Sequence, residues 1–212
     1  MSQIALPLAP RSKDDPARIV LGSANRHVAE ALQDAERWPF RTAVLTGPPR
    51  SGKSLLARWF EGAGKGEALD DADALDETEL FHRWNRAQES GRPLLLVGRA
   101  QGWEIALPDL RSRLGAALHV EIGAPDDEMV AALIESHAAR RGLALGEGAL
   151  TYLVPRAERS FAGVEQLVAA IDRLSLERKA PATLSIWRDA LAAVQGSVQG
   201  PEQGKLGLDP AK

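Results

Sequence analysis

Short apolar runs alternate with amphipathic stretches as far as Ile122, a pattern typical of a parallel sheet flanked by helices. The predicted strands cover residues 41–45, 93–97 and 117–122, with a weaker strand before Asp70. The predicted helices cover residues 24–38, 55–60, 77–88 and 108–115. Ser23 is the expected N-cap of the first helix, because its hydroxyl can accept a hydrogen bond from an N–H group of the first turn.

After the last predicted strand the pattern is helical only. Asp126 should cap one helix, Gly148–Val154 should form a short helix, Ser160 should open a longer one and Ser185 should cap the last. The apolar faces of the two longer helices consist of Val130, Leu133, Ile134 and His137, and of Phe161, Val164, Leu167, Val168, Ile171 and Leu174. A small all-α domain therefore follows an α/β domain.

Both ends of the chain lack hydrophobic periodicity. Residues 2–16 are polar and rich in proline, and residues 196–212 are rich in Gly, Gln, Pro and Lys. We therefore expect a flexible arm over 1–16, an α/β domain over 17–123, a helical domain over 124–195 and a disordered tail over 196–212.

Composition narrows the class of protein. A length of 212 residues can hold one domain, or one domain with a small satellite, and the hydrophobic fraction of 44% is enough for a core. The net charge of -3 argues against a nucleic-acid binder that works by bulk charge. The sequence has no cysteine, and its four histidines show no metal-ligand spacing. No secretory signal or membrane-spanning run is found, so we expect a soluble cytoplasmic protein.

The stretch Thr46–Ser54 fits the phosphate-binding loop pattern G-x-x-x-x-G-K-[ST]. Gly47 and Gly52 permit turns that a Cβ would block, so that N–H groups can converge on phosphate oxygens. Lys53 supplies positive charge, and the following helix points its positive end at the same anion. A glycine and proline turn could match by chance, but a strand before the loop and a helix after it favour a phosphate site.

A magnesium site is the second expectation. The Ser54 hydroxyl is placed to bind Mg²⁺, and a carboxylate after a strand can hold the same ion through water. Asp70 and Asp71 are the candidates for that carboxylate. The alternative is an acidic loop that caps the next helix.

The segment Gln3–Leu8 lies within the N-terminal arm. It places a polar residue before Leu, Pro and Leu in an extended stretch. Such a segment can bind in a groove, because proline restricts its free conformations. Taken alone, the segment is more typical of a disordered tail.

Three segments resemble the DnaA/Hda branch of the AAA+ proteins. Ile19–Arg26 is similar to the "VGxxN" segment of the initiator DnaA, and Leu107–Leu114 looks like the "LPDLxSRL" segment of the Hda family. Gln3–Leu8 matches the N-terminal Q-L-x-L-P-L peptide with which that family binds the sliding clamp. The resemblance covers about residues 3–192. It implies a P-loop parallel sheet flanked by helices, smaller than usual, followed by a small helical lid.

The resemblance also implies roles for matching residues. The clamp-binding residues would be Gln3, Ile4, Leu6, Pro7 and Leu8. ADP or ATP, with Mg²⁺, would contact Leu21, Gly22, Gly47, Pro48, Pro49, Arg50, Ser51, Gly52, Lys53 and Ser54. Arg113 would act as an arginine finger in trans, toward ATP held by DnaA. Taken alone, Arg113 is equally typical of a surface arginine packed at a helix end.

The α/β domain departs from the family in two places. The interval between Lys53 and Asp70 is too short for a strand–helix unit usually found there, so the sheet should lack one strand. After the strand at 93–97, Gly98 and Arg99 replace the expected polar residue, which weakens any sensing of a γ-phosphate.

The lid departs as well. The family presents an arginine to the nucleotide from the lid, and that place falls near Glu165 here. A carboxylate repels phosphate, and Arg156 or Arg159 would have to substitute. We therefore expect the chain's own ATPase to be weak or absent.

The first functional hypothesis is a negative regulator of replication initiation that binds the DNA polymerase III sliding clamp and stimulates hydrolysis of DnaA-bound ATP. Self-association is compatible with it; sequence-specific DNA binding and membrane binding are not expected. The alternatives are a P-loop small-molecule kinase, an ATPase of the helicase-loader type, and a non-hydrolysing scaffold for the clamp and DnaA. Loss of stimulation on replacing Arg113 would separate a regulator from a scaffold.

Overall fold

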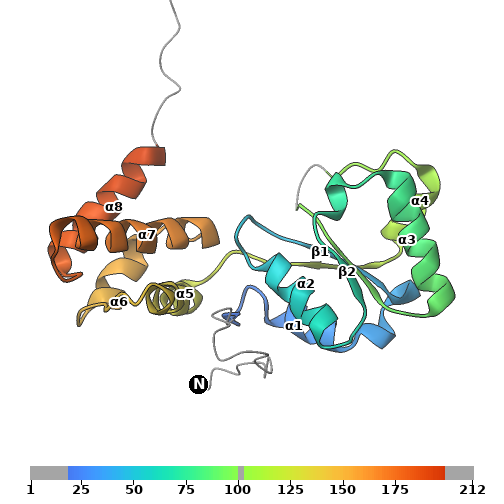
Figure 1. Ribbon diagram of the computed structural model, residues 1–212, viewed down its shortest axis with the longest axis horizontal. Coiled ribbons are helices and arrows are strands. Elements are labelled where there is room, and N and C mark those ends of the chain that lie inside the picture. The colour runs from blue at the N-terminus through green and yellow to red at the C-terminus, as the bar shows by residue number, and fades with distance from the viewer. Residues whose placement is uncertain (1–18, 100–102, 199–212) are drawn as a thin grey trace, which may run out of the picture.

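A computed structural model describes residues 19–99 and 103–198, which form an α/β domain and a helical lid joined end to end (Figure 1). The segment Gln3–Leu8 and most of the expected C-terminal tail lie outside the described residues. Helix α8 runs to Val198, past the position where the tail was expected to begin.

Four parallel strands form the sheet of the α/β domain. They are β1 (Thr42–Thr46), β2 (Glu67–Leu69), β3 (Leu94–Val97) and β4 (Leu118–Glu121), in the order β2-β3-β1-β4. All residues of β3 are buried, which explains its continuous apolar run. The expected small parallel sheet is confirmed.

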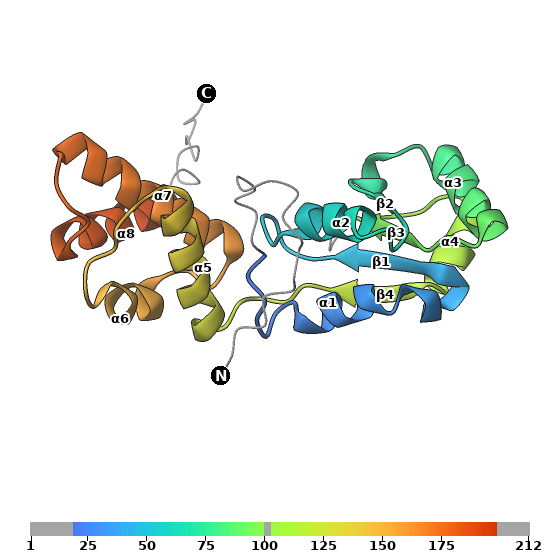
Figure 2. The ribbon, with the colours of Figure 1, turned by 60° about the horizontal axis from the view of Figure 1, so that its bottom comes forward.

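Helices cover both faces of this sheet (Figure 2). On one face, α1 (Arg26–Gln33) and α2 (Lys53–Gly62) pack Leu32, Leu56 and Phe60 against Leu45 and Leu95. On the other face, α3 (Glu77–Ser90) and α4 (Pro108–Gly115) contribute a second core, which consists of Leu80, Trp84, Leu110 and Leu114 with Val44, Leu94 and Leu96. The alternation of side chains along β1 and β3 therefore divides the core into two layers.

The beginning of α1 differs from the expectation. The helix starts at Arg26, so Ser23 is not its N-cap. The Asn25 side chain, 1% exposed, instead accepts a hydrogen bond from Gly22 N at 2.9 Å and donates one to Val20 O at 2.9 Å. Ser23 forms a side-chain hydrogen bond with Asp126 at the start of the lid.

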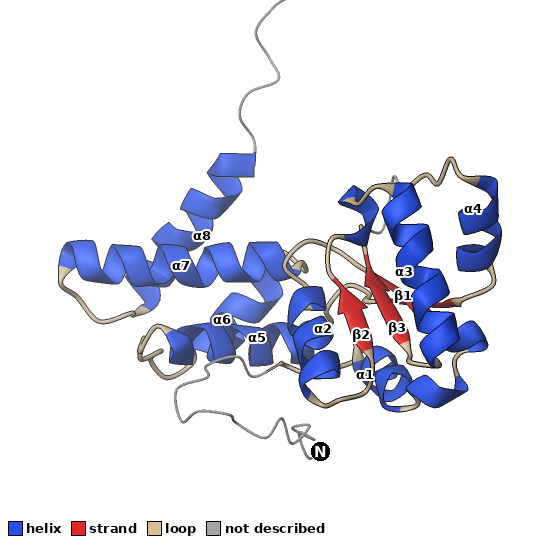
Figure 3. Ribbon diagram, turned by 45° about the vertical axis from the view of Figure 1, so that its right-hand side comes forward, coloured by secondary structure: helices blue, strands red, loops and turns tan. Residues whose placement is uncertain are grey.

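The lid contains α5 (Asp127–Arg140), α6 (Ala149–Leu153), α7 (Phe161–Arg178) and α8 (Leu184–Val198) (Figure 3). Two expected caps are present: Asp126 accepts from Met129 N at 2.8 Å, and Ser160 Oγ accepts from Gly163 N at 2.9 Å. Ser185 lies inside α8 and does not cap it. Over the ranges described, no helix is long and apolar enough to cross a membrane.

Candidate functional site

The loop between β1 and α2 has the shape that the motif requires. Gly52 adopts a φ of 91°, which an L side chain rarely adopts. A Cβ on Gly47 would lie 2.9 Å from the Cβ of Ile122. Ile122 N also donates to Thr46 O at 2.9 Å, so the residue after β4 supports the loop from below. Both glycines are therefore required by the local geometry.

Polar groups in this loop fit an anion. Ser51 Oγ is buried and has no hydrogen-bond partner among residues 19–99 and 103–198. Lys53 Nζ donates to Gly47 O at 2.9 Å and to Pro48 O at 3.0 Å. Burial lowers the pKa of Lys53, and the carboxylates of the neighbouring acidic loop partly oppose that shift. A phosphate group would supply the acceptor that the Ser51 hydroxyl lacks and a counter-charge for Lys53.

The magnesium candidates lie at the same edge of the sheet. Ser54 is half-buried in the first turn of α2, and Asp70 and Asp71 are exposed immediately after β2. Within residues 19–99 and 103–198, no group of three His, Asp or Glu residues could hold a metal by itself. A P-loop Mg²⁺ needs few protein ligands, because phosphates and water supply the others. The arrangement is therefore compatible with Mg²⁺ held together with a nucleotide.

A third acidic residue, Asp73, takes a different role. Its side chain is only 4% exposed and forms an ion pair with Arg99. A Cβ on Gly98 would meet the Trp103 ring at 2.7 Å, which explains glycine at that position. The position of a carboxylate directly after a strand does not predict the role of Asp73, because the burial of Asp73 depends on the fold around β3.

The residues expected near the base lie where the α/β domain meets the lid. Leu21 and Gly22 are half-buried before α1. A Cβ on Gly22 would lie 3.0 Å from Met129 Sδ, in the first turn of α5. These two residues are therefore at the domain junction, beside the lid.

Glu165 of α7 faces the phosphate-binding loop and binds Arg50. Arg50 Nε donates to Glu165 Oε2 at 2.5 Å, and Arg50 Nη2 donates to Oε1. Arg50 has a φ of 64°. Hydrogen bonding to Arg50 is the main reason that the pKa of Glu165 is lowered, with further contributions from His137 and Arg141. Sequence alone does not reveal this pair, because its partners are far apart in the chain.

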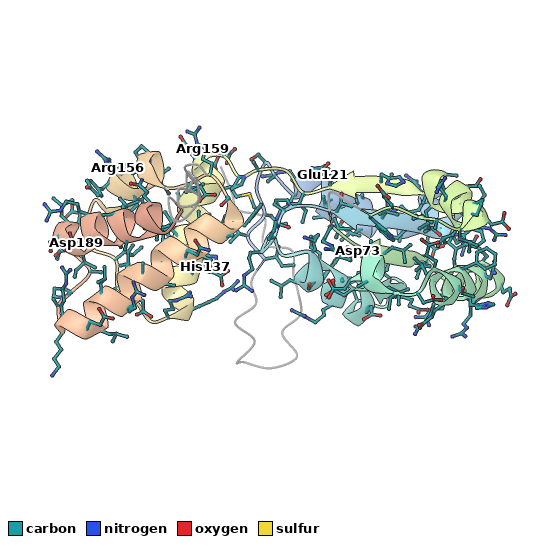
Figure 4. The ribbon with its side chains drawn as sticks, turned by 90° about the horizontal axis from the view of Figure 1, so that it is seen from above. Asp73, Glu121, His137, Arg156, Arg159 and Asp189 are labelled. Atoms are coloured by element: carbon teal, nitrogen blue, oxygen red, sulfur yellow. The ribbon has the colours of Figure 1, made fainter. Side chains whose placement is uncertain are left out.

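The two arginines considered as substitutes for a lid arginine are engaged elsewhere. Arg159 pairs with Asp127 at 2.9 Å. The Arg156 guanidinium lies 4.3 Å from the Tyr152 ring centroid and donates to Tyr152 O at 2.9 Å. Figure 4 shows both arginines toward one side of the lid and His137 toward the other.

Arg113 lies in the last turn of α4. Helix α4 lies at the end of the α/β domain away from α7 (Figures 1 and 3). The guanidinium carbon of Arg113 is 4.4 Å from the Trp84 ring centroid and 4.7 Å from that of Phe81. Arg113 Nη1 donates to Asn85 Oδ1 at 2.8 Å. The side chain is half-buried against α3.

Comparison with known proteins agrees with this architecture. Residues 126–191 match the family described as "Hda, lid domain". An uncharacterized protein of Haemophilus influenzae is 26% identical over 180 residues, which cover 80% of this chain and 78% of that protein.

Solved structures show the same fold at low identity. Domain III of the replication initiation protein DnaA from Thermotoga maritima is 15% identical with a TM-score of 0.68, covering 82% of this chain and 94% of that one. DnaA bound to AMPPCP and single-stranded DNA is 18% identical with a TM-score of 0.56, covering 75% and 65%. The RuvB Holliday junction branch migration motor of Thermotoga maritima is 18% identical with a TM-score of 0.58, covering 88% and 72%.

A parallel sheet with a phosphate-binding loop, followed by a helical lid, is the AAA+ fold that these solved structures share, and it confirms the predicted fold class. The lid match and the likeness to DnaA domain III narrow the assignment. The lid is similar to that of the Hda family, and the α/β domain and lid together have the fold of DnaA domain III.

Proposed function

We propose that this chain is a cytoplasmic negative regulator of replication initiation that binds the sliding clamp and stimulates hydrolysis of ATP bound to DnaA. One observation carries the proposal: an Hda lid domain follows a P-loop domain with the fold of DnaA domain III. The known AAA+ neighbours include one DnaA bound to the nucleotide analogue AMPPCP, which supports nucleotide binding by the shared fold.

The nucleotide is ADP or ATP, held with Mg²⁺. Lys53 contributes positive charge to the phosphates, and Ser51 donates from its otherwise unpartnered hydroxyl. Ser54 and one of Asp70 or Asp71 hold the metal. Leu21 and Gly22 face the base from the domain junction.

The arm brings the chain to its place of action. Gln3, Ile4, Leu6, Pro7 and Leu8 bind the clamp as an extended peptide. Tethering raises the effective concentration of the AAA+ domain near clamp-loaded DNA, so that its second contact with DnaA forms without additional interface.

Arg113 completes the site of DnaA in trans. Arg113 belongs to α4, and this helix lies at the end of the domain away from α7 (Figure 1), which favours action on a neighbouring molecule. A guanidinium placed on developing phosphate charge is worth about 10³–10⁵ in rate. For this step the Arg113 side chain has to leave Phe81, Trp84 and Asn85. Docking on DnaA supplies the free energy for that change.

The test measures hydrolysis of ATP bound to DnaA, with this chain added, in the presence and absence of DNA-loaded clamp. Wild type is compared with Arg113→Ala, with the arm variant Gln3→Ala/Leu6→Ala, and with Arg111→Ala as a control on the same helix. We expect stimulation only with loaded clamp, its loss in the first two variants and its retention in the control. Absence of stimulation by wild type under every condition would refute the proposal.

A scaffold that binds the clamp and DnaA without stimulating hydrolysis is the second candidate. The packing of Arg113 against two aromatic rings favours this candidate, because Arg113 cannot reach a neighbouring nucleotide as long as it stays packed on them. Clamp and DnaA binding with unchanged hydrolysis in both wild type and Arg113→Ala would establish this alternative.

A further inference from the structure

One ion pair joins the lid to the phosphate-binding loop, and it has the geometry of a specific recognition contact. Both oxygens of the Glu165 carboxylate accept hydrogen bonds from the Arg50 guanidinium, from Nε and from Nη2. Bidentate pairs of this kind are among the stronger charge-assisted contacts in proteins. The Glu165 side chain is 24% exposed, so it is partly shielded from water even though Arg50 is 64% exposed.

The surroundings of Glu165 are cationic. Arg141, on the lid side of the junction, adds to the effect of Arg50 in stabilising the charged carboxylate. Lys53 and the buried, unpartnered Ser51 hydroxyl lie in the same loop as Arg50. The lid carboxylate is thus an anion presented to an anion-binding loop.

Arg50 lies in the part of the motif that surrounds a bound phosphate group. Arg50 is one of the four variable residues between Gly47 and Gly52, where the backbone wraps the phosphates of a bound nucleotide. A nucleotide therefore brings negative charge to the loop that Glu165 already contacts. Like charges brought together in this way oppose each other.

We propose that Glu165 is a built-in competitor of the nucleotide, which holds the lid on the loop through Arg50 and opposes phosphate binding there. The proposal rests on the nucleotide binding proposed above and adds a residue that sets its strength. It inverts the usual chemistry of such a lid, in which a cation faces the phosphates.

The test is ADP binding in the presence of Mg²⁺, measured by titration calorimetry on the full chain. Glu165→Gln removes the carboxylate, and Glu177→Gln removes an equal charge from the same helix about 18 Å further along. We expect Glu165→Gln to bind ADP about five- to tenfold more tightly than wild type. Glu177→Gln should bind within about twofold of wild type.

Arg50→Ala separates competition from simple loosening of the lid. Both Arg50→Ala and Glu165→Gln break the same ion pair, but Arg50→Ala leaves the carboxylate and removes a cation. Competition predicts weaker ADP binding in Arg50→Ala and tighter binding in Glu165→Gln. A shift of both variants in the same direction, or no difference between Glu165→Gln and Glu177→Gln, would overturn the proposal.

The same data distinguish failure of this proposal from failure of nucleotide binding itself. If neither wild type nor Glu165→Gln binds ADP, the proposed nucleotide binding and the proposed competition are both overturned. If the two proteins bind ADP equally tightly, only the competition is overturned. DnaA and clamp are absent from the assay, so their proposed roles do not affect it.

The nucleotide-free contact is measured separately. Because the sequence has no cysteine, spin labels can be placed at two introduced cysteines, replacing the exposed Arg58 of α2 and Arg173 of α7. We expect a narrow distance distribution in the parent chain and a broader one with Glu165→Gln. Identical distributions would show that the pair does not hold the lid and would overturn that part of the proposal.

Discussion

Arg113 of α4 lies over the ring of Trp84 of α3, with 4.4 Å between the guanidinium carbon and the ring centroid. Phe81 and Asn85, one turn apart on the same helix, complete its surroundings. The arginine that the Hda resemblance implicates in catalysis is therefore held by its own domain, and its packing energy opposes release.

The packing of Arg113 should contribute to the free energy of unfolding. Arg113→Ala removes two cation–π contacts and one hydrogen bond, so we expect the free energy of unfolding to fall by about 1–2 kcal/mol in urea denaturation. Arg86→Ala, an exposed arginine of α3, is the control and should change stability by less than about 0.5 kcal/mol. Equal effects of the two substitutions would mean that the packed position of Arg113 is not populated in solution.

Gly66, at the turn before β2, lies too close to its neighbours for any side chain. An added Cβ would lie 2.3 Å from Pro93 O and 2.7 Å from a ring carbon of Phe60. We expect Gly66→Ala to lower the thermal stability by the equivalent of about 1–3 kcal/mol or more. At Gly62, at the end of α2, an added Cβ meets no atom of the described residues within 4 Å. Gly62→Ala should therefore leave stability unchanged or raise it by up to about 1 kcal/mol. Similar melting temperatures for both variants would contradict the position of β2.

Asn25 should contribute strongly to the stability of the fold. Its buried side chain makes two hydrogen bonds, to Gly22 N and Val20 O, and the Asn25→Ala variant leaves both groups without that partner. We expect a loss of about 1–3 kcal/mol in the free energy of unfolding. Glu30→Ala, on the exposed side of α1, should stay within about 0.5 kcal/mol of wild type. A neutral Asn25→Ala would contradict the hydrogen bonding seen before α1.

Asp126 predicts a pH dependence of lid stability. Its pKa is lowered from 3.8 by the hydrogen bond from Met129 N and by a second one with Ser23. A carboxyl whose pKa is lower in the folded state than in the unfolded state stabilises the folded state at pH values above its unfolded-state pKa. This stabilisation is lost as the pH falls through the folded-state pKa. Asp126→Ala should therefore cost about 1 kcal/mol at neutral pH, with a difference from wild type that shrinks below pH 3.8.

Ser160→Ala is the control for this experiment. The Ser160 hydroxyl also caps a lid helix, but it does not ionise, so the capping bond from Gly163 N should persist in acid, although the bond that the hydroxyl donates to Glu158 involves a carboxylate. Urea denaturation of both variants at neutral and acidic pH makes the comparison. A difference between wild type and Asp126→Ala that is the same at both pH values would contradict the assignment.

Sequence predicted those features that depend on local or periodic signals. The phosphate-binding loop follows from fixed residue types at fixed spacing, and α7 follows from apolar residues at helical intervals after a serine cap. β3 follows from its continuous apolar run, because both of its faces are buried. Each signal lies within one short segment.

Features that depend on distant segments could not be predicted. Ser23 has the residue type of an N-cap, but its hydroxyl bonds to Asp126, far along the chain, and Asn25 precedes the helix instead. The Arg50–Glu165 pair joins residues 115 positions apart. The sequence places a carboxylate near the phosphates, yet only the folded chain reveals its partner.

The contact between Ile122 and the phosphate-binding loop bears on how the chain folds during synthesis. β1 pairs with β3 and β4, both of which come later in the sequence, and Gly47 rests on Ile122. When the ribosome has just synthesised the Gly-Lys-Ser motif, the strands and the isoleucine that support the loop have not yet been made. The ribosome must synthesise more than half of the polypeptide before the loop can fold. A truncated product that ends before Ile122 would therefore contain the phosphate-binding sequence without the folded phosphate-binding loop.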